Sequence, residues 1–213
     1  MPRKTTLRRQ PVQQRGQQRI EGLLNAADAL FAEVGYEQAT TNAIAARAGT
    51  SIGSLYQFFG DKRAILEALA QRYRDQLHAV HGAVLTPDNA HLPLAEIYDR
   101  ILRALADFHA RNRGFRPLFY GSATSGELSA AGQALREECI GRVEQMMALR
   151  VPKLDPGRRR LLATINVEVI RALLPLSESG DERFRQSMIG EIKKMLLGYM
   201  AAEVSEVGHA PAR

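Results

Sequence analysis

The sequence predicts an all-α protein with two domains, and three observations lead to this prediction. Apolar residues recur at intervals of three and four along most of the chain, which is the period of one face of an α-helix. No segment shows the strict alternation of apolar and polar residues that is typical of a half-buried strand. Near the N-terminus, two short apolar segments that end in glycine are followed by much longer ones. We therefore expect a small helical domain followed by a larger helical domain.

Composition limits the class of protein. Hydrophobic residues make up 45% of the 213 residues, which is enough for a folded core. No apolar run reaches the roughly 18 residues that a membrane span needs. The single cysteine, Cys139, cannot form an intramolecular disulfide. We expect a cytoplasmic protein with no membrane partner.

Positive charge is concentrated at the N-terminus. A basic arm on an otherwise balanced chain indicates a polyanionic partner, although a solubilising tail or a cloning remnant fits the composition equally well. Residues 1–19 contain no acidic residue, and their basic residues equal the net charge of +6 of the whole chain: Arg3, Lys4, Arg8, Arg9, Arg15 and Arg19.

The first three helices are marked by their boundaries. The first is expected to begin near residue 17 and to end at Gly35, because glycine accepts a left-handed backbone. Two short helices follow, at 42–48 and 52–59. Small polar residues are expected to cap them and glycines to end them: Thr41 and Gly49 for the first, Ser51 and Gly60 for the second.

Longer helices account for most of the remaining chain. Asp61 is expected to cap a helix to about residue 85, and a loop with Pro87 separates it from a helix at 93–112. Further helices are expected at 127–149, 156–176 and 182–204, the last two capped by Asp155 and Asp181. The predicted organisation is a flexible basic arm (1–16), a first domain (17–66), a second domain (67–205) and a disordered tail (206–213).

The short helix pair has the dimensions of a helix-turn-helix. In such a unit the second helix enters the major groove of DNA while the first braces it. The turn contains Gly49, and Ala45 and Ala48 are small enough for a close helix crossing. Helix pairs with short turns are common in all-helical proteins, so pattern and charge leave DNA binding and a purely structural helix pair equally open.

Residues 40–66 read TTNAIAARAGTSIGSLYQFFGDKRAIL. This run resembles the DNA-binding signature of the TetR/AcrR regulators, and the preceding FAEVGY at 31–36 is similar to the end of the family's first helix. The likeness is specific over about residues 17–66 and only architectural beyond them. It implies a three-helix DNA-binding domain with a helix-turn-helix, followed by a larger helical domain that binds a ligand and dimerises.

The resemblance also implies positions that contact DNA. Tyr56 and Lys62 match places from which a side chain reaches a phosphate, and Gln57 and Ser54 lie where base edges can be contacted. Arg47 fits a DNA contact and a solvated surface charge equally well. The second short helix contains no arginine, so bidentate guanine recognition from it is not expected. The expected DNA-binding set is Thr41, Asn42, Arg47, Ser51, Ile52, Gly53, Ser54, Tyr56, Gln57 and Lys62.

For the second domain the resemblance implies an effector pocket and a dimer interface. The pocket is expected to be mostly apolar with a few polar anchors, although each candidate fits an ordinary core position at least as well. The candidate lining residues are Tyr98, Leu102, Leu105, Phe108, Phe119, Met146, Met147, Asn166 and Ile170. The candidate dimer contacts, on the last helix, are Met188, Ile192, Met195, Leu196 and Tyr199.

The sequence contains no recognisable catalytic pattern. His78 and His81 have a spacing found in metal sites, but no cluster of further ligands accompanies them, so we interpret them as two exposed histidines. Glycine-rich phosphate loops and nucleophile motifs are absent from the sequence. We expect neither an enzyme nor a metal or cofactor site.

The predicted function is that of a sequence-specific transcription regulator. The resemblance implies a repressor that binds double-stranded DNA at a palindromic operator as a homodimer and is released by a small, largely apolar effector. Two other classes stay open: a helical interaction module, and a regulator that does not use a small-molecule ligand.

Overall fold

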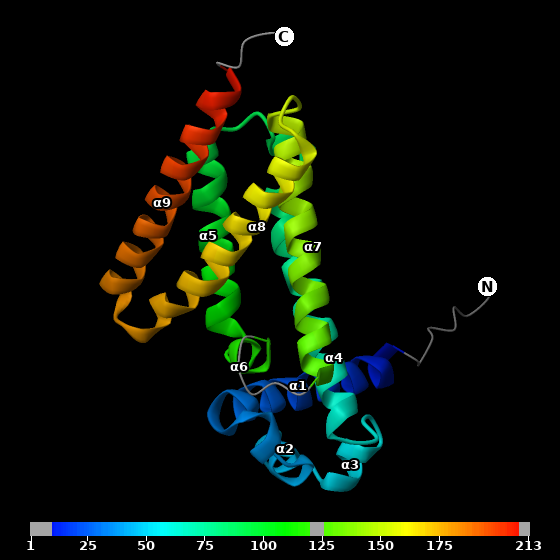
Figure 1. Cartoon of the computed structure of the whole chain (residues 1–213). Helices are drawn as coiled ribbons and strands as arrows, with labels where there is room; N and C mark the ends of the chain where they lie inside the picture. Colours follow the sequence, from blue (N-terminus) through cyan, green and yellow to red (C-terminus); the bar gives the residue numbers. More distant parts are fainter. Residues whose placement is uncertain (1–9, 120–125, 209–213) are drawn as a thin grey trace, which may run out of the picture. The chain divides into compact units, whose positions relative to one another are not determined.

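The computed structural model describes the backbone of residues 10–119 and 126–208, and the side chains of residues 14–118 and 132–201. All regular structure in these ranges is helical, which confirms the all-α prediction (Figure 1). No helix in this part of the chain is long and apolar enough to cross a membrane. The chain divides into two compact units, and the first consists of Met1–Arg72 and Asn112–Gly121. The second consists of Tyr73–Arg111 and Ser122–Arg213.

The first unit is built from three short helices, one whole long helix and the first part of another. Four of its helices come from the N-terminal third of the chain, whereas α6 comes from the middle of the sequence. Their bounds are α1 (Gln10–Gln38), α2 (Thr41–Arg47), α3 (Ile52–Tyr56), α4 (Lys62–Val84) and α6 (Phe115–Phe119), with α4 continuing into the second unit.

Helix α1 starts earlier than the sequence predicts. It begins at Gln10, so residues 10–16 are helical where the sequence analysis places a flexible arm. The segment is rich in glutamine, with Gln10, Gln13 and Gln14, and this unbranched side chain loses little rotational freedom in a helix. Near the other end, Gly35 has a φ of 76° and interrupts the helix as expected of a glycine, but helical residues continue beyond this kink to Gln38.

The helices of the first unit share one hydrophobic core. Leu23 and Phe31 of α1 and Leu55 of α3 are completely buried. Phe115 and Leu118 of α6 are also buried, so a segment far along the sequence completes this core. The predicted domain boundaries missed α6, because five residues are too few to show a helical period.

Helix α6 is joined to α1 by a close backbone approach. The N–H of Gly114 donates a hydrogen bond of 3.3 Å to Oδ1 of Asp28, a buried carboxylate in the middle of α1. A Cβ atom added to Gly114 would lie 2.6 Å from the Asp28 carbonyl oxygen, well inside van der Waals contact. The connection between α5 and α6 therefore requires glycine at this point.

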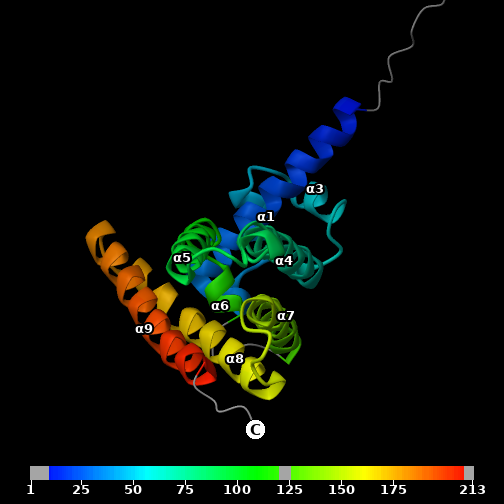
Figure 2. The same cartoon turned by 90° about the horizontal axis from the view of Figure 1, so that it is seen from above.

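The second unit is a bundle of longer helices. Figure 2 shows α8 and α9 as an outer layer on the side of this unit away from α4. The predicted caps Asp155 and Asp181 are confirmed, since their carboxylates accept the N–H groups of Arg158 at 3.0 Å and Phe184 at 2.8 Å. The bounds are α5 (Leu94–Arg111), α7 (Gly126–Arg150), α8 (Pro156–Leu173) and α9 (Glu182–Gly208), with short 3₁₀ turns η1 (Pro87–Asn89) and η2 (Leu174–Ser179).

The two histidines of α4 have different surroundings, and the prediction that both are exposed is wrong for His81. His78 is accessible and pairs with Glu138, whereas His81 is buried. Burial, reinforced by the nearby charge of Arg142, lowers the pKa of His81 to about 4, so the imidazole is neutral at pH 7. Its role in the described structure is that of a core residue.

The approach of α6 to α1 gives a stability prediction. Gly114→Ala should lower the free energy of unfolding by roughly 1–3 kcal/mol, because the new methyl group must displace backbone rather than a flexible side chain. Gly22→Ala is the matched control, since Gly22 lies inside α1 and nothing is found within 4 Å of its added Cβ. That control should leave stability equal or raise it by up to about 1 kcal/mol. Urea denaturation followed by circular dichroism compares them, and equal stability would contradict the close approach.

Candidate functional site

Helix α2 is positioned by a cap and by two buried side chains. Its N-cap is Thr40, whose hydroxyl oxygen accepts the N–H of Ala43 at 3.1 Å, so the prediction of Thr41 as the cap is wrong by one residue. This shift makes Thr41 the first helical residue and leaves its hydroxyl available elsewhere. Ile44 and Ala45 are buried. Gly49 then turns the chain with a φ of 64°.

Helix α3 begins as predicted but ends earlier. Ser51 is its N-cap and accepts the N–H of Ser54 at 3.1 Å. Leu55 is buried against the core, and the helix ends at Tyr56 instead of residue 59. Phe59 is also buried, so the chain leaves the helix in a turn that carries this ring into the core. Helix α3 is therefore only about one and a half turns long, with Leu55 on its buried side.

The outer face of the helix pair consists of polar side chains without charge. Tyr56 is 52% exposed, which is unusual for a large ring, and Gln57 and Asn42 are exposed beside it. The Tyr56 hydroxyl lies 3.3 Å from Oγ1 of Thr41, within hydrogen-bond distance, so α2 and α3 are linked on this face. Gly53 is exposed, and a Cβ added to it would meet only Oγ of Ser51, at 4.0 Å, among the described residues. The face offers several hydrogen-bond donors and acceptors to a large external partner.

Some side chains predicted to contact DNA already form contacts within the protein or are buried. Arg47 forms an ion pair of 2.6 Å with Glu33 of α1, and this hydrogen bond lowers the pKa of the Glu33 carboxyl group. Lys62 donates to backbone carbonyls at the end of α1. The Ser54 hydroxyl oxygen is buried without a hydrogen-bond partner among the described residues, so it is not presented outward in this conformation. Glu33 was missed at the sequence level, because its pairing depends on how α1 and α2 cross.

The candidate effector residues lie mostly in the interior of the second unit. Tyr98 donates its hydroxyl to Oδ1 of Asn166, and the amide group of Asn166 donates to the Leu162 carbonyl at 2.9 Å and to Sδ of Met200 at 3.4 Å. Burial raises the pKa of Tyr98 far above its usual range, so its hydroxyl stays protonated. This polar group links α5, α8 and α9 within an apolar interior.

The other candidates show the same burial. Ile170 is half-buried, and the Phe119 side chain lies outside the described residues. The remaining members are buried: Leu102, Leu105, Phe108, Met146 and Met147. Burial of this kind fits core positions as well as a lining, so the assignment to a pocket stays a prediction.

The candidate dimer residues do not share one face of α9. Ile192 and Leu196 are each 1% exposed and pack within their own unit, so they cannot form the surface offered to a partner. Met195 is 46% exposed, and Met188 and Tyr199 are half-buried. A helix that is apolar on more than one side does not reveal from sequence which side faces inward.

Two sequence profiles match the chain. Residues 23–69 match the profile described as bacterial regulatory proteins, tetR family. Residues 93–200, about half of the chain, match the tetracyclin repressor-like C-terminal domain. The chain belongs to the TetR family. Together with the helix-turn-helix, this membership makes it a DNA-binding transcription regulator, which is a class without catalytic function.

Curated relatives have more than one role. The nucleoid occlusion factor SlmA of Glaesserella parasuis serovar 5 is 31% identical over 163 residues, which cover 74% of this chain and 73% of that protein. The transcriptional activator FasR of Mycolicibacterium smegmatis is 32% identical over 66% of this chain, but the match spans only 64% of FasR. Membership of the family therefore does not by itself define a repressor.

Solved structures have the same fold. A TetR-family transcriptional regulator from Streptomyces coelicolor has a TM-score of 0.57 and 26% identity, over 86% of this chain and 98% of that one. A TetR-like regulator from Rhodococcus sp. RHA1 has a TM-score of 0.66 over 86% and 96% of the two chains. The second is only 20% identical, so it supports the fold alone.

Proposed function

We propose that the protein is a homodimeric repressor that binds a palindromic operator through α3 and leaves it when a small, largely apolar effector binds the second unit. The observation that carries this proposal is the exposed Tyr56–Gln57 face of α3, held outward because Leu55 and Phe59 are anchored in the core. The Tyr56 ring is exposed beside the amide groups of Gln57 and Asn42, although its hydroxyl lies near that of Thr41. This face suits the surface of a DNA duplex, where phosphates and base edges lie close together.

Each exposed residue of the face is assigned a contact by its chemistry. The Tyr56 hydroxyl donates to a phosphate oxygen, and Thr41 and Asn42 reach the same backbone from α2. Gln57 has an amide that can pair with the N6 and N7 atoms of adenine. Ile52 and Gly53, at the start of α3, contact a thymine methyl group by shape, while the oxygen of Ser51 remains the helix cap. Arg47 reaches DNA only by leaving Glu33, and Ser54 only by rotating its side chain.

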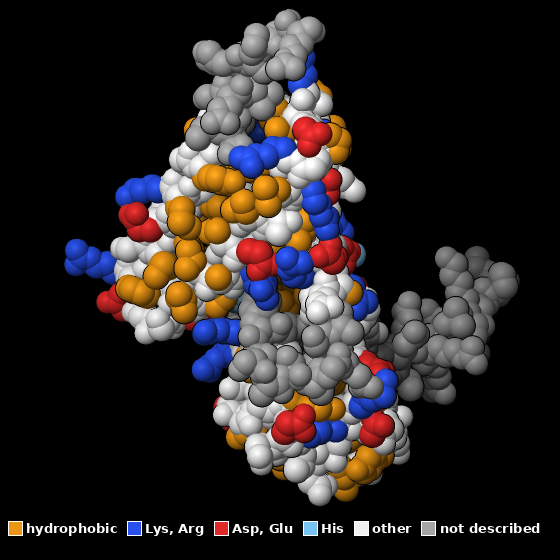
Figure 3. All heavy atoms as spheres, viewed as in Figure 1, with side chains coloured by type: hydrophobic (Ala, Val, Ile, Leu, Met, Phe, Trp, Pro, Cys, Tyr) orange, Lys and Arg blue, Asp and Glu red, His pale blue; other side chains and the backbone are white. Residues whose placement is uncertain are grey.

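The outer layer of the second unit supplies the proposed dimer surface. Figure 3 shows hydrophobic side chains gathered on the face that α8 and α9 present. The small residues Gly198 and Ala201 are exposed on α9, which allows close approach of another helix. Binding of such a dimer to a palindrome would require two α3 helices about 34–36 Å apart, or a multiple of that spacing. The large hydrophobic side chains exposed on α8, α9 and the η2 turn between them are Leu161, Leu176, Phe184 and Met195.

The effector is proposed to enter the apolar interior around the Tyr98–Asn166 pair. A neutral tyrosine and an amide can orient one hydrogen-bonding group of a ligand, while the surrounding side chains favour apolar surface. Release from DNA then requires that the ligand bind one conformation of the protein more tightly than the other. Helix α4, which runs from one unit into the other, is one covalent connection through which such a difference could reach α3.

A second candidate function follows from the relatives. The match to proteins named nucleoid occlusion factor favours a DNA-binding protein that acts in nucleoid occlusion. Such a protein should occupy many sites spread over the chromosome, whereas a repressor should occupy few.

Sequencing the DNA retained by the purified protein separates these functions. The repressor proposal predicts a small number of palindromic sites that overlap promoters, and higher transcription of the adjacent genes when the protein is absent. Many dispersed sites without a change in transcription would support the second candidate. Loss of transcription would indicate an activator, and retention of DNA without sequence preference would contradict sequence-specific regulation.

Two substitutions distinguish positioning on DNA from base recognition. Tyr56→Phe removes only the hydroxyl, so it should weaken binding to every operator variant by a similar factor. Gln57→Ala should instead relax preference at one position in each half-site, since a bidentate base contact contributes roughly 1–3 kcal/mol of discrimination. Titration of single-base operator variants at fixed salt measures both effects. A uniform loss for Gln57→Ala would refute its assigned role, and circular dichroism must show unchanged helix content.

The dimer surface makes a separate prediction. Met195→Asp should convert a dimer to a folded monomer, because desolvating a carboxylate in an apolar interface is costly. Leu196→Asp is unsuitable for this purpose because its side chain is buried within the chain and the protein would unfold. Lys194→Asp is the control, because Lys194 is the exposed neighbour of Met195 on α9, and this variant should remain dimeric. Light scattering at micromolar concentration gives the mass, and a monomeric wild-type protein would contradict the proposed assembly.

A further inference from the structure

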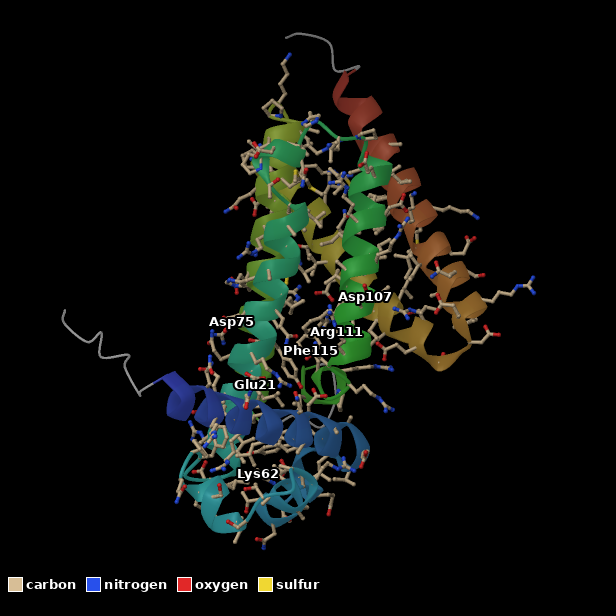
Figure 4. All side chains as sticks on the ribbon, turned by 180° about the vertical axis from the view of Figure 1, so that it is seen from behind. Glu21, Lys62, Asp75, Asp107, Arg111 and Phe115 are labelled. Carbon is tan, nitrogen blue, oxygen red and sulfur yellow. The ribbon has the colours of Figure 1, made fainter. Side chains whose placement is uncertain are left out.

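Lys62 makes an unusual set of contacts at the base of the helix-turn-helix. Its Nζ donates to the Tyr36 carbonyl at 2.8 Å and to the Glu37 carbonyl at 3.2 Å. The same ammonium group lies 4.4 Å from the centre of the Tyr36 ring, which is within the range of a cation–π interaction. Figure 4 shows Lys62 on the side of α1 that faces the α2–α3 pair.

The turn at the end of α1 explains why these acceptors are available. Gly35 breaks the helix with its left-handed backbone, so the carbonyl groups that follow it need partners outside the regular helix. The Tyr36 ring is held in place by an edge contact with Phe31, at 5.5 Å between ring centres, and Phe31 is completely buried. A lysine ammonium has three donors and no acceptor, so it can serve two carbonyl oxygens and face a ring at once.

These contacts close a loop in the chain. Lys62 and Tyr36 are 26 residues apart, and the whole α2–turn–α3 segment lies between them. The segment leaves the core at the end of α1 and returns to it at the start of α4, and Lys62 joins these two points. Fixing both ends of a loop restricts how the helices within it can tilt.

We infer that Lys62 is a positioning residue for DNA binding: it holds the base of the helix-turn-helix through the Tyr36 and Glu37 carbonyls and the Tyr36 ring, and it does not act as a phosphate contact. This inference replaces the role that the family resemblance implies for Lys62, and it rests on the proposed use of α3 as the DNA-binding helix. We call the contacts that Lys62 makes with Tyr36 and Glu37, at the turn formed by Gly35, the base clasp.

The base clasp and a phosphate contact differ in their dependence on salt. A lysine that neutralises a phosphate releases condensed counterions, and its loss lowers the salt slope of binding by about 0.9 for each site. A lysine that positions α3 changes the affinity without changing the slope. The clasp also predicts effects in the absence of DNA, because the three contacts exist within the free protein.

Lys62→Met tests the inference directly, with Arg63→Met as the matched control. Arg63 is the next residue, is exposed and pairs with Glu67 of the same helix at 2.9 Å, so its replacement removes the same charge at nearly the same place. Amide hydrogen exchange of the free protein is expected to accelerate roughly tenfold or more over residues 36–59 in Lys62→Met, and to stay unchanged in Arg63→Met. Operator affinity of Lys62→Met should fall roughly tenfold at an unchanged salt slope.

A second variant keeps the test decisive if Lys62→Met folds poorly. Tyr36→Leu retains the lysine charge and both carbonyl groups but removes the ring. If the base clasp exists, Tyr36→Leu should accelerate amide exchange over the same residues. The acceleration in the double variant, Tyr36→Leu with Lys62→Met, should be less than the product of the accelerations in the two single variants. Independent, multiplicative effects would overturn the clasp.

Two further outcomes would also overturn the inference. One is unchanged exchange in Lys62→Met together with a salt slope lowered by about 0.9 per subunit, which is the result for a phosphate contact. The other is full operator affinity in Lys62→Met. Because exchange is measured without DNA, it decides the structural part of the inference even if α3 proves not to be the DNA-binding helix.

Discussion

The rest of the DNA-binding unit depends on one constraint: α2 and α3 are too short to be stable by themselves. They have 7 and 5 residues, whereas isolated helices shorter than about 12–15 residues are marginal in water. Their conformation must therefore come from outside, through capping side chains at each N-terminus and through apolar anchors in a core built by α1, α4 and α6. Leu55 is the main anchor of α3, and it leaves the opposite side of that helix free. The exposure of Tyr56 and Gln57 is a direct consequence.

The second unit shows how polar groups inside an apolar bundle define its packing. The Tyr98–Asn166 pair satisfies its own hydrogen bonds across α5, α8 and α9, and a change at either residue would leave the other buried and unpaired. On the same α9, Lys193 pairs with Asp99 of α5 at 2.6 Å at a less buried position. These contacts set the rotation of α9, so Ile192 faces inward and Met195 outward. The surface available to a second subunit is thus a result of pairing inside one chain.

Much of the fold could be predicted from the sequence because its signals are local. Ser51, Asp155 and Asp181 cap the predicted helices, and Gly35 and Gly49 adopt positive φ, since a cap or a glycine stop acts on residues within one turn. What was missed or wrong depends on contacts between distant segments. Examples are the place of α6 in the first core, the orientation of α9, and the ion pair that occupies Arg47. No local pattern encodes these, because they follow from helix crossings that form only in the folded chain.

In the proposed complex, the residues that recognise the DNA sequence differ from the charged residues that contribute most to affinity. The outer face of α3 has no charged side chain, and Arg47 beside it is already paired with Glu33. A hydrogen bond from Gln57 to a base can select a sequence and one from Tyr56 can position α3 on the duplex, but neutral groups release few counterions, and counterion release drives much of the binding to DNA. Further positive charge lies on the chain before the first core residue, where Arg15 and Arg19 are exposed on α1. If Lys62 holds the base clasp, this N-terminal segment becomes the principal source of electrostatic affinity, and α3 is left to discriminate between sequences by shape and hydrogen bonding.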